Sequence, residues 1–328
     1  MFAPGLLSMI VSLALSSASD LPTLEQQALD AAKSVEQSVP AVVAPKAKPH
    51  RMVMTWIPSY AVAESLTQLK ALHGGAGPSK ALTHIGLQFW LPISSGGVAK
   101  DSDAVSDAQI KQIVAWGHQH GIKVLLCVYN ATGGDTWDWG LAKSAFAGHR
   151  DAFVNALVAE MNRLGLDGID IDFEGDDPPT PTSQLNLDKP AYVAFVKALH
   201  VKLHKAGKQL TIDSFSDQWN APNWTWWTAL FPYVDGLTSM GYDEIGMNAA
   251  GSAKYSNQVA HAATSSAKLM LGMPSWVDHW QGNDAVAQTN WLLTHKNVSV
   301  SIWDAEFTAP EWQKAPVWKN LQKVRGAP

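Results

Sequence analysis

The chain of 328 residues has a single cysteine, Cys127, and few charged residues, 16% of the total. One cysteine excludes an intramolecular disulfide, and its place in the apolar run 124–128 indicates a buried structural thiol rather than a nucleophile. No basic patch stands out, and the formal net charge of −5 argues against nucleic acid as a partner. Beyond the N-terminus, no apolar run approaches the ~20 residues of a membrane-spanning helix.

The N-terminal residues differ from the rest of the chain. An apolar stretch from residue 6 to residue 15 precedes the small residues Ser16, Ser17 and Ala18, the arrangement of a secretory signal peptide. This stretch is too short to span a bilayer, so we expect no permanent membrane anchor. Residues 20–49, rich in Ala, Val, Gln and Pro, are typical of a leader and flexible linker. The sequence therefore predicts a signal peptide at 1–19, a linker at 20–49, a globular domain at 50–328 and secretion, either extracellular or periplasmic.

From residue 50 onwards, strand-like apolar runs alternate with segments of helical period. We expect eight strands, at residues 52–57, 83–90, 123–129, 168–173, 209–215, 236–242, 268–273 and 298–303. The helices between them are expected at residues 61–72, 107–120, 142–164, 189–206, 257–266 and 285–295. This α/β pattern and the chain length match a (β/α)8 TIM barrel. A doubly wound sheet is the alternative, but no Gly-rich phosphate motif follows the first strand.

Three acids lie on the fourth expected strand, where Asp170, Asp172 and Glu174 alternate with apolar residues. Because successive side chains of a strand point to opposite faces, the three carboxyls share one face. Carboxyls this close cannot all ionise freely, and burial adds to that cost. A structural ion-pair network and an acidic metal site are alternatives, but carboxylates performing acid–base chemistry are the favoured interpretation. In a barrel, catalysis takes place at the C-terminal ends of the strands, which is where Glu174 falls.

No metal ion or other cofactor is expected. No His-x-x-x-His pair lies beside the acids, and His118 and His120 fall on an expected helix, as surface residues far from the strand ends. Asp167 precedes the strand with opposite parity to Asp170, so we expect it to be structural rather than catalytic.

Tryptophan is unusually abundant, with 15 in the chain. Large aromatic side chains commonly pack in cores, and we expect this of about half of them. Others lie in loop-like contexts, where their flat faces suit a groove that stacks on sugar rings. Trp137, Trp139 and Trp219 follow the third and fifth expected strands, so we expect them to face such a groove and to bind substrate.

The spacing of Asp167, Asp170, Asp172 and Glu174 resembles the D-x-x-D-x-D-x-E signature of glycoside hydrolase family 18 at every fixed position. This family comprises chitinases, endo-β-N-acetylglucosaminidases and some inactive lectin-like relatives. Four fixed acids on a strand that follows a helix are a specific signal, whereas a lone Asp-x-Glu would carry none. Motif and expected fold both place the site at the end of the fourth strand.

Other strand ends carry the same resemblance. Residues 240–243 read Met-Gly-Tyr-Asp, similar to the family's M-x-Y-D motif, and residues 301–304 read Ser-Ile-Trp-Asp, similar to its terminal tryptophan. Residues 272–274 are close to the family's G-x-P element, and the second strand resembles the family's strand ending in Phe, here Phe89.

Two departures concern the groove. The family's S-x-G-G element at the third strand is not reproduced, because the glycine pair, Gly133 and Gly134, comes later in the sequence. Many chitinases also insert a small α+β module after the seventh strand, which walls the groove. Here residues 273–298 leave room only for a loop and a helix. We therefore expect a comparatively shallow, open groove without an insertion module.

The resemblance implies a role for each acid. Glu174 is the expected general acid, and later the base, in hydrolysis assisted by the substrate's own 2-acetamido group. Asp172 is expected to orient that group through its N–H, and Asp170 to share a proton with Asp172, so that the pair titrates as a unit. Tyr242 is expected to orient the acetamido group.

The resemblance also implies residues that bind the sugar. Asp243 and Tyr242 are expected to contact the reacting unit, Met240 belongs to the same motif, and Trp303 should form the floor. The expected function is that of a secreted, monomeric, chitinase-like hydrolase of β-1,4-linked N-acetylglucosamine (GlcNAc) chains. Two alternatives stay open. The first is an endo-β-N-acetylglucosaminidase acting on the N-glycan core or on peptidoglycan-derived sugar, and the second is an inactive chitin-binding lectin.

Overall fold

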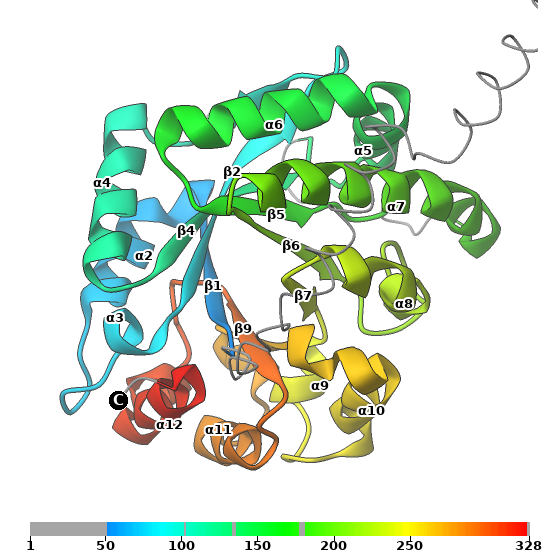
Figure 1. Cartoon of the computed structure of the whole chain (residues 1–328). Helices are drawn as coiled ribbons and strands as arrows, with labels where there is room; N and C mark the ends of the chain where they lie inside the picture. The colour runs from blue at the N-terminus through cyan, green and yellow to red at the C-terminus, as the bar shows by residue number, and fades with distance from the viewer. Residues whose placement is uncertain (1–50, 102, 133–135, 177–180, 327–328) are drawn as a thin grey trace, which may run out of the picture. The chain divides into compact units, whose positions relative to one another are not determined.

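The computed structural model describes residues 51–101, 103–132, 136–176 and 181–326. The expected signal peptide and the whole expected linker lie outside these residues. Eight parallel strands form the centre, namely β1 (Val53–Pro58), β2 (His84–Pro92), β4 (Lys123–Tyr129), β5 (Gly168–Asp172), β6 (Gln209–Ser214), β7 (Gly236–Ser239), β8 (Leu269–Pro274) and β9 (Ser299–Trp303). Because β1 pairs with both β2 and β9, the sheet closes on itself. The predicted (β/α)8 barrel is confirmed, and the doubly wound alternative is excluded (Figure 1).

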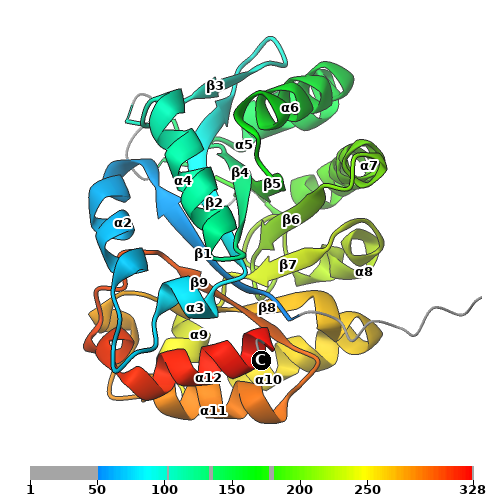
Figure 2. The same cartoon turned by 60° about the vertical axis from the view of Figure 1, so that its left-hand side comes forward.

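Helices surround the strands, as Figure 2 shows. They are α2 (Val62–Lys70), α3 (Pro78–Ala81), α4 (Asp107–Gln119), α5 (Trp139–Lys143), α6 (Arg150–Leu164), α7 (Thr182–Lys205), α8 (Trp227–Leu230), α9 (Tyr242–Gly246), α10 (Ala253–Ala262), α11 (Ala285–Thr294) and α12 (Ala315–Arg325). Two local signals explain helix boundaries well. Ser106 and Gln109 form a capping box at the start of α4, and Gly165 ends α6 with a left-handed φ of 74°.

Some elements differ from the expectation. The helix expected over 142–164 is divided by the π-helical turn Ser144–Gly148 into α5 and α6. Helix α7 begins at Thr182 and runs through Pro190, so it starts earlier than the helix expected over 189–206. Helix α12 was not expected, nor was the short strand β3 (Val98–Lys100), which pairs antiparallel with β2 and extends the barrel wall.

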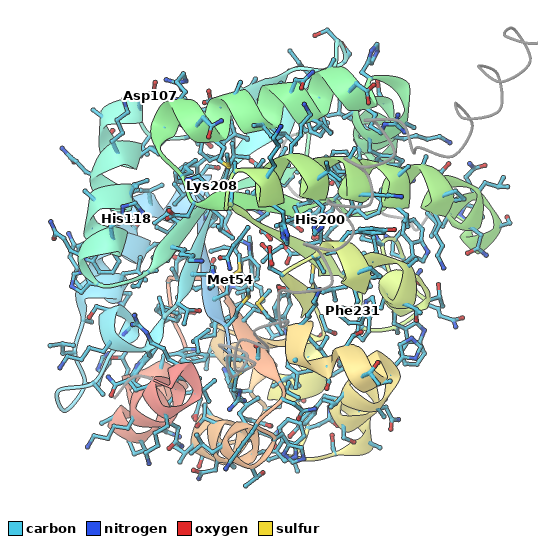
Figure 3. All side chains as sticks on the ribbon, in the orientation of Figure 1. Met54, Asp107, His118, His200, Lys208 and Phe231 are labelled. Carbon is cyan, nitrogen blue, oxygen red and sulfur yellow. The ribbon has the colours of Figure 1, made fainter. Side chains whose placement is uncertain are left out.

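The strands separate two apolar regions. One lies between the barrel and the helices, and every residue of β1, β5 and β8 is buried, as strands covered on both faces require. The other lies inside the barrel and consists of Met52, Met54, Trp56, Leu125, Cys127 and Met270. Figure 3 shows Met54 inside the barrel and His118 beside the outer helices. Cys127 is thus a buried thiol, and burial together with Asp170 raises its pKa well above the ordinary value.

Asp167 lies at the N-terminal end of the barrel, opposite to the end that carries Glu174. Its carboxylate accepts the backbone N–H of Val124 at 2.9 Å and faces His118 Nε2 at 2.8 Å. The residue therefore ties β4 and α4 to the start of β5, in line with the structural role expected for it.

The connection from β8 to β9 contains the short helical turn Val277–His279 and α11, with no inserted module among the described residues. None of the described helices has the length and apolar character needed to cross a membrane.

Candidate active site

The C-terminal ends of the barrel strands open into a cleft of about 1030 Å³. Asp172 and Glu174 line it from β5 and the residues that follow, and Met240 and Tyr242 line it from the end of β7. Trp303 lies at the end of β9. The barrel thus brings together side chains that are far apart in the sequence, at the end where a barrel carries its chemistry.

Asp170 is the deepest of the three acids on β5 and is fully buried. Trp56 Nε1 donates a hydrogen bond to its Oδ2 at 2.7 Å, and Thr211 Oγ1 donates to its Oδ1 at 2.5 Å. Burial raises the pKa of Asp170, while these donors oppose the rise. Gly86 makes room for the Trp56 ring, because a Cβ at that position would lie 2.5 Å from Trp56 Cδ1.

Asp172 lies one step closer to the cleft and is 4% exposed. Gln88 Nε2, from β2, donates to its Oδ2 at 2.6 Å. Burial and the neighbouring Asp170 raise the pKa of Asp172 to about 7, so this carboxyl exchanges its proton near neutrality. Asp170 and Asp172 are therefore two buried carboxyls on β5, and the charge of Asp170 opposes the ionisation of Asp172.

Glu174 stands at the mouth of the series and is partly exposed to the cleft. Burial, followed by the charge of Asp172, raises its pKa well above the ordinary value, which keeps the carboxyl protonated further towards neutral pH. Its backbone is held by Asn130, whose Oδ1 accepts the Glu174 N–H and whose Nδ2 donates to the Glu174 carbonyl, both at 2.8 Å. A carboxyl with a raised pKa, on a backbone held in place beside a cleft, has the properties that a general acid needs.

Asp213 on β6 also lines the cleft and was not singled out from the sequence. Asp170 pairs with Thr211 across β5 and β6, which places Asp213 beside Asp172 one step further along. Asp213 is 3% exposed, and its Oδ1 has no hydrogen-bond partner among the described residues. Burial and the charges of the two β5 acids raise its pKa. Strand parity around the barrel was the signal that could have found it.

Tyr242 enters the cleft from the first residue of α9. Gly272 on β8 leaves space for its ring, since a Cβ there would lie 2.7 Å from Tyr242 Cε1. Trp276 stands edge-on to the tyrosine ring, with centroids 6.3 Å apart, and lines the same cleft. Burial and the charge of Asp213 raise the pKa of Tyr242, so its hydroxyl stays protonated and able to donate.

Two of the predicted aromatic residues lie in the cleft. Trp303 forms part of its floor and packs against Trp56, with ring centroids 5.8 Å apart. Trp137 lines the wall and stands edge-on to Tyr129 at 6.4 Å.

Trp139 does not face the groove, so that prediction is wrong. It is 3% exposed and packs against Phe146 and Trp226, and its Nε1 donates to Asp188 Oδ2 at 3.0 Å. The reason is that α5 begins at Trp139 and this first turn rests against α7, the helix that carries Asp188.

Trp219 and Asp243 are both exposed and lie outside the cleft lining. Trp219 is 53% exposed on the loop after β6, where it packs edge-on against Phe215. The side chain of Asp243 is 59% exposed and pairs with His279 Nδ1, although its motif neighbour Tyr242 enters the cleft. The structure therefore places neither residue against the three acids.

One group of described residues has donor atoms close enough to share a metal ion: Cys127, Asp170 and Asp213 lie within 4.8 Å of one another. Both oxygens of Asp170 already accept hydrogen bonds, from Trp56 and Thr211. Burial also raises the pKa of all three groups, and metal ligands must be deprotonated. This donor set fits proton sharing better than metal binding.

Comparison with known proteins agrees with this geometry. Residues 54–325 match the model of the family "Glycosyl hydrolases family 18". The chain belongs to this family. The resemblance seen in the sequence is therefore confirmed, and family 18 membership makes the chain a glycosidase-family protein with a carbohydrate as its class of substrate.

Several solved structures share the fold. A chitinase from Chromobacterium violaceum superposes with a TM-score of 0.61 at 16% identity, covering 85% of this chain and 100% of that one. A chitinase from Bacteroides thetaiotaomicron gives 0.63 at 15% identity, covering 83% and 96%. The Bacillus cereus spore cortex-lytic enzyme SleL gives 0.62 at 14% identity, covering 85% and 75%. No curated protein was found to match the sequence.

Proposed function

We propose that this family 18 protein hydrolyses β-1,4-linked GlcNAc chains, chitin or its oligomers, with retention at the anomeric carbon. The observation that carries the proposal is the series Asp170, Asp172 and Glu174, which rises from the barrel interior to the cleft, where burial raises the pKa of the last carboxyl. Tyr242 lies in the same cleft, and Trp303 provides an apolar floor for a sugar ring.

In the proposed reaction Glu174 donates its proton to the glycosidic oxygen as the C1–O bond breaks. The carbonyl oxygen of the substrate's 2-acetamido group attacks C1 and forms an oxazolinium ion, so the substrate supplies the nucleophile. Asp172 accepts the acetamido N–H and offsets the positive charge that develops, and Tyr242 donates to the acetamido oxygen. Glu174, now a carboxylate, then takes a proton from a water molecule. The water oxygen attacks C1 and opens the oxazolinium ring.

The burial of Asp172 supports this role. Asp172 lines the cleft, but it is only 4% exposed and its Oδ2 is held by a hydrogen bond from Gln88 Nε2, which leaves little freedom to move towards C1. A fixed acceptor below the sugar suits an acetamido N–H better than it suits a covalent bond to C1. The raised pKa of Asp172 lets it share one proton with Asp170 as charge develops above it.

A second candidate is hydrolysis of a related GlcNAc-containing polymer, either the N-glycan core or a peptidoglycan-type chain. The likeness to SleL, a spore cortex-lytic enzyme, is as close as the likeness to the chitinases. The open connection between β8 and β9 also leaves one side of the cleft without a module that would restrict the substrate.

Purified protein incubated with chitin oligomers, a high-mannose glycoprotein and peptidoglycan tests the proposal. We expect the oligomers to be cleaved, glucose oligomers to remain intact and a thiazoline mimic of the oxazolinium to inhibit. Release of glycan with the chitin oligomers untouched would favour the second candidate. Chitin binding without turnover between about pH 4 and pH 8 would instead indicate the lectin alternative.

We also propose that the protein is exported, because residues 1–19 have the pattern of a signal peptide. Fractionation of cells that express the full chain, with N-terminal sequencing of the mature protein, would test this. We expect a mature N-terminus near residue 19 in the extracellular or periplasmic fraction.

A further inference from the structure

The charges that line the cleft are strongly one-sided. Five acids line it, namely Asp101, Asp103, Asp172, Glu174 and Asp213. Among the described lining residues the single cation is Lys100, on strand β3. A substrate that enters the cleft therefore meets carboxyl groups at the catalytic centre and again along the arm formed by β2 and β3.

Lys100 is already engaged by groups outside the cleft. Its Nζ donates to Asp107 Oδ1 at 2.8 Å and to the Val105 carbonyl at 3.2 Å. Asp107 lies at the start of α4, at the outer edge of the molecule in Figure 3, and also pairs with Arg163. The carboxylate of Asp107 therefore already offsets the charge of Lys100, which weakens its attraction for a substrate anion.

Asp101 presents a fixed carboxylate in the outer arm. Ser59 Oγ donates to its Oδ2 at 2.6 Å and Tyr129 OH donates to the same oxygen at 2.5 Å. Asp103 follows two residues later, is exposed, and donates its N–H to Asp101 Oδ1 at 3.4 Å. The arm therefore has two carboxyl groups close together.

We propose that this cleft selects β-linked GlcNAc chains whose sugar units are uncharged or carry an ammonium group, and rejects chains with carboxylated sugars such as muramic acid. An anionic unit in the arm would face Asp101 and Asp103, and the one cation among the described lining residues, Lys100, is already paired with Asp107, which opposes binding. A glucosamine unit, with a protonated amine, would find acceptors there. The inference rests on the proposed function and names its substrate class.

Three substrates separate charge from shape. They are a GlcNAc oligomer, a chain of alternating GlcNAc and muramic acid, and the same chain with its lactyl carboxyls converted to amides. We expect kcat/KM to be at least about tenfold higher for the amidated chain than for the acid chain, the factor given by roughly 1.4 kcal/mol of like-charge repulsion. The ratio should shrink as salt rises, because salt screens charges at an open cleft.

Two charge-reversal variants test whether the acidic residues of the cleft cause the difference in kcat/KM between the acid and amidated chains. Asp103→Lys should narrow the difference between the acid and amidated chains by several-fold. Asp151→Lys makes the same change at a side chain that is 84% exposed on α6 and outside the cleft lining, and should leave the difference unchanged. Neither residue belongs to the catalytic machinery.

Equal hydrolysis of the acid and amidated chains, with the GlcNAc oligomer cleaved, would overturn the inference alone. If neither the acid chain nor the amidated chain were cleaved at any salt concentration, the shape of the lactyl group rather than its charge would exclude these substrates. That result would also overturn the inference. If the GlcNAc oligomer itself were neither bound nor cleaved, the proposed function would fail and this inference with it.

Discussion

The side-chain amide of Asn130 holds the backbone of Glu174 on both sides, accepting its N–H and donating to its carbonyl at 2.8 Å each. Asn130 is fully buried, and its Nδ2 also donates to the Asp138 carbonyl at 3.0 Å. The proposed acid is thus positioned by the end of a neighbouring strand, β4, as well as by its own. Small errors in the position of a reacting group lower the rate steeply.

Asn130→Ala should therefore lower kcat about 10- to 100-fold with little change in KM. The substitution also leaves buried backbone groups without hydrogen-bond partners, so the free energy of unfolding should fall by ~1–3 kcal/mol. Asn320→Ala is the matched control, because Asn320 is buried outside the cleft lining and its Nδ2 donates to Thr289 Oγ1 at 3.1 Å and to Asn290 Oδ1 at 2.9 Å. We expect the control variant to lose about as much Tm as the Asn130 variant but much less kcat. Equal losses of kcat would show that Asn130 is only structural.

Glu174→Gln keeps the shape of the side chain but removes the proton that the leaving oxygen needs. Turnover of GlcNAc oligomers should fall by ~10²–10⁴, with substrate binding largely retained. Steady-state kinetics and calorimetric titration with an oligomer measure the two effects. A variant with near-normal turnover would rule out Glu174 as the general acid.

Asp172→Asn should severely lower turnover and yet raise the stability of the fold at high pH. The pKa of Asp172 is raised from 3.8 to about 7, so between these values the folded state holds a proton that the unfolded chain has released. The contribution of this carboxyl to stability therefore falls as pH rises through that window, by about 1.4 kcal/mol for each unit of pKa. We expect the variant's gain in Tm over the native chain to be larger at pH 8 than at pH 5. An equal change at both pH values would contradict the raised pKa.

Trp137 and Trp139 lie two positions apart but should respond to truncation in opposite ways. Trp137→Ala should weaken oligomer binding and leave Tm nearly unchanged, because the ring lines the cleft wall. Trp139→Ala should destabilise the protein by ~3–5 kcal/mol, because the ring is buried against α7. Trp219→Ala, at an exposed loop residue, should affect neither quantity for short oligomers. Loss of binding in the Trp219 variant would extend the substrate path past the described cleft.

Sequence patterns located most of the barrel because parallel strands buried on both faces are continuous apolar runs. Alternation along β5 also placed Asp170, Asp172 and Glu174 on one face, where the structure has them. Alternation along a strand is a local pattern with a period of two residues, so it can be recognised in the sequence without knowledge of the tertiary structure.

Asp213, Asn130 and Trp139 show what such patterns miss. Asp213 is a lone acid on β6, and it becomes notable only through the pairing of β5 with β6. The bonds from Asn130 to Glu174 join residues 44 positions apart. Trp139 looked loop-like, but its burial depends on Asp188, 49 positions away. Sequence periodicity gives the direction of a side chain within its own element, not its partner in another.

Cys127 gives this barrel a built-in reporter of its own opening. It is the single cysteine of the chain, and it is fully buried inside the barrel beside Asp170. A thiol reagent can reach it only in molecules whose strands have separated, so the labelling rate measures how often the barrel opens. A ligand that binds only the closed form should slow labelling in proportion to its occupancy. While the barrel stays closed, its one thiol is therefore shielded from reagents in the solvent.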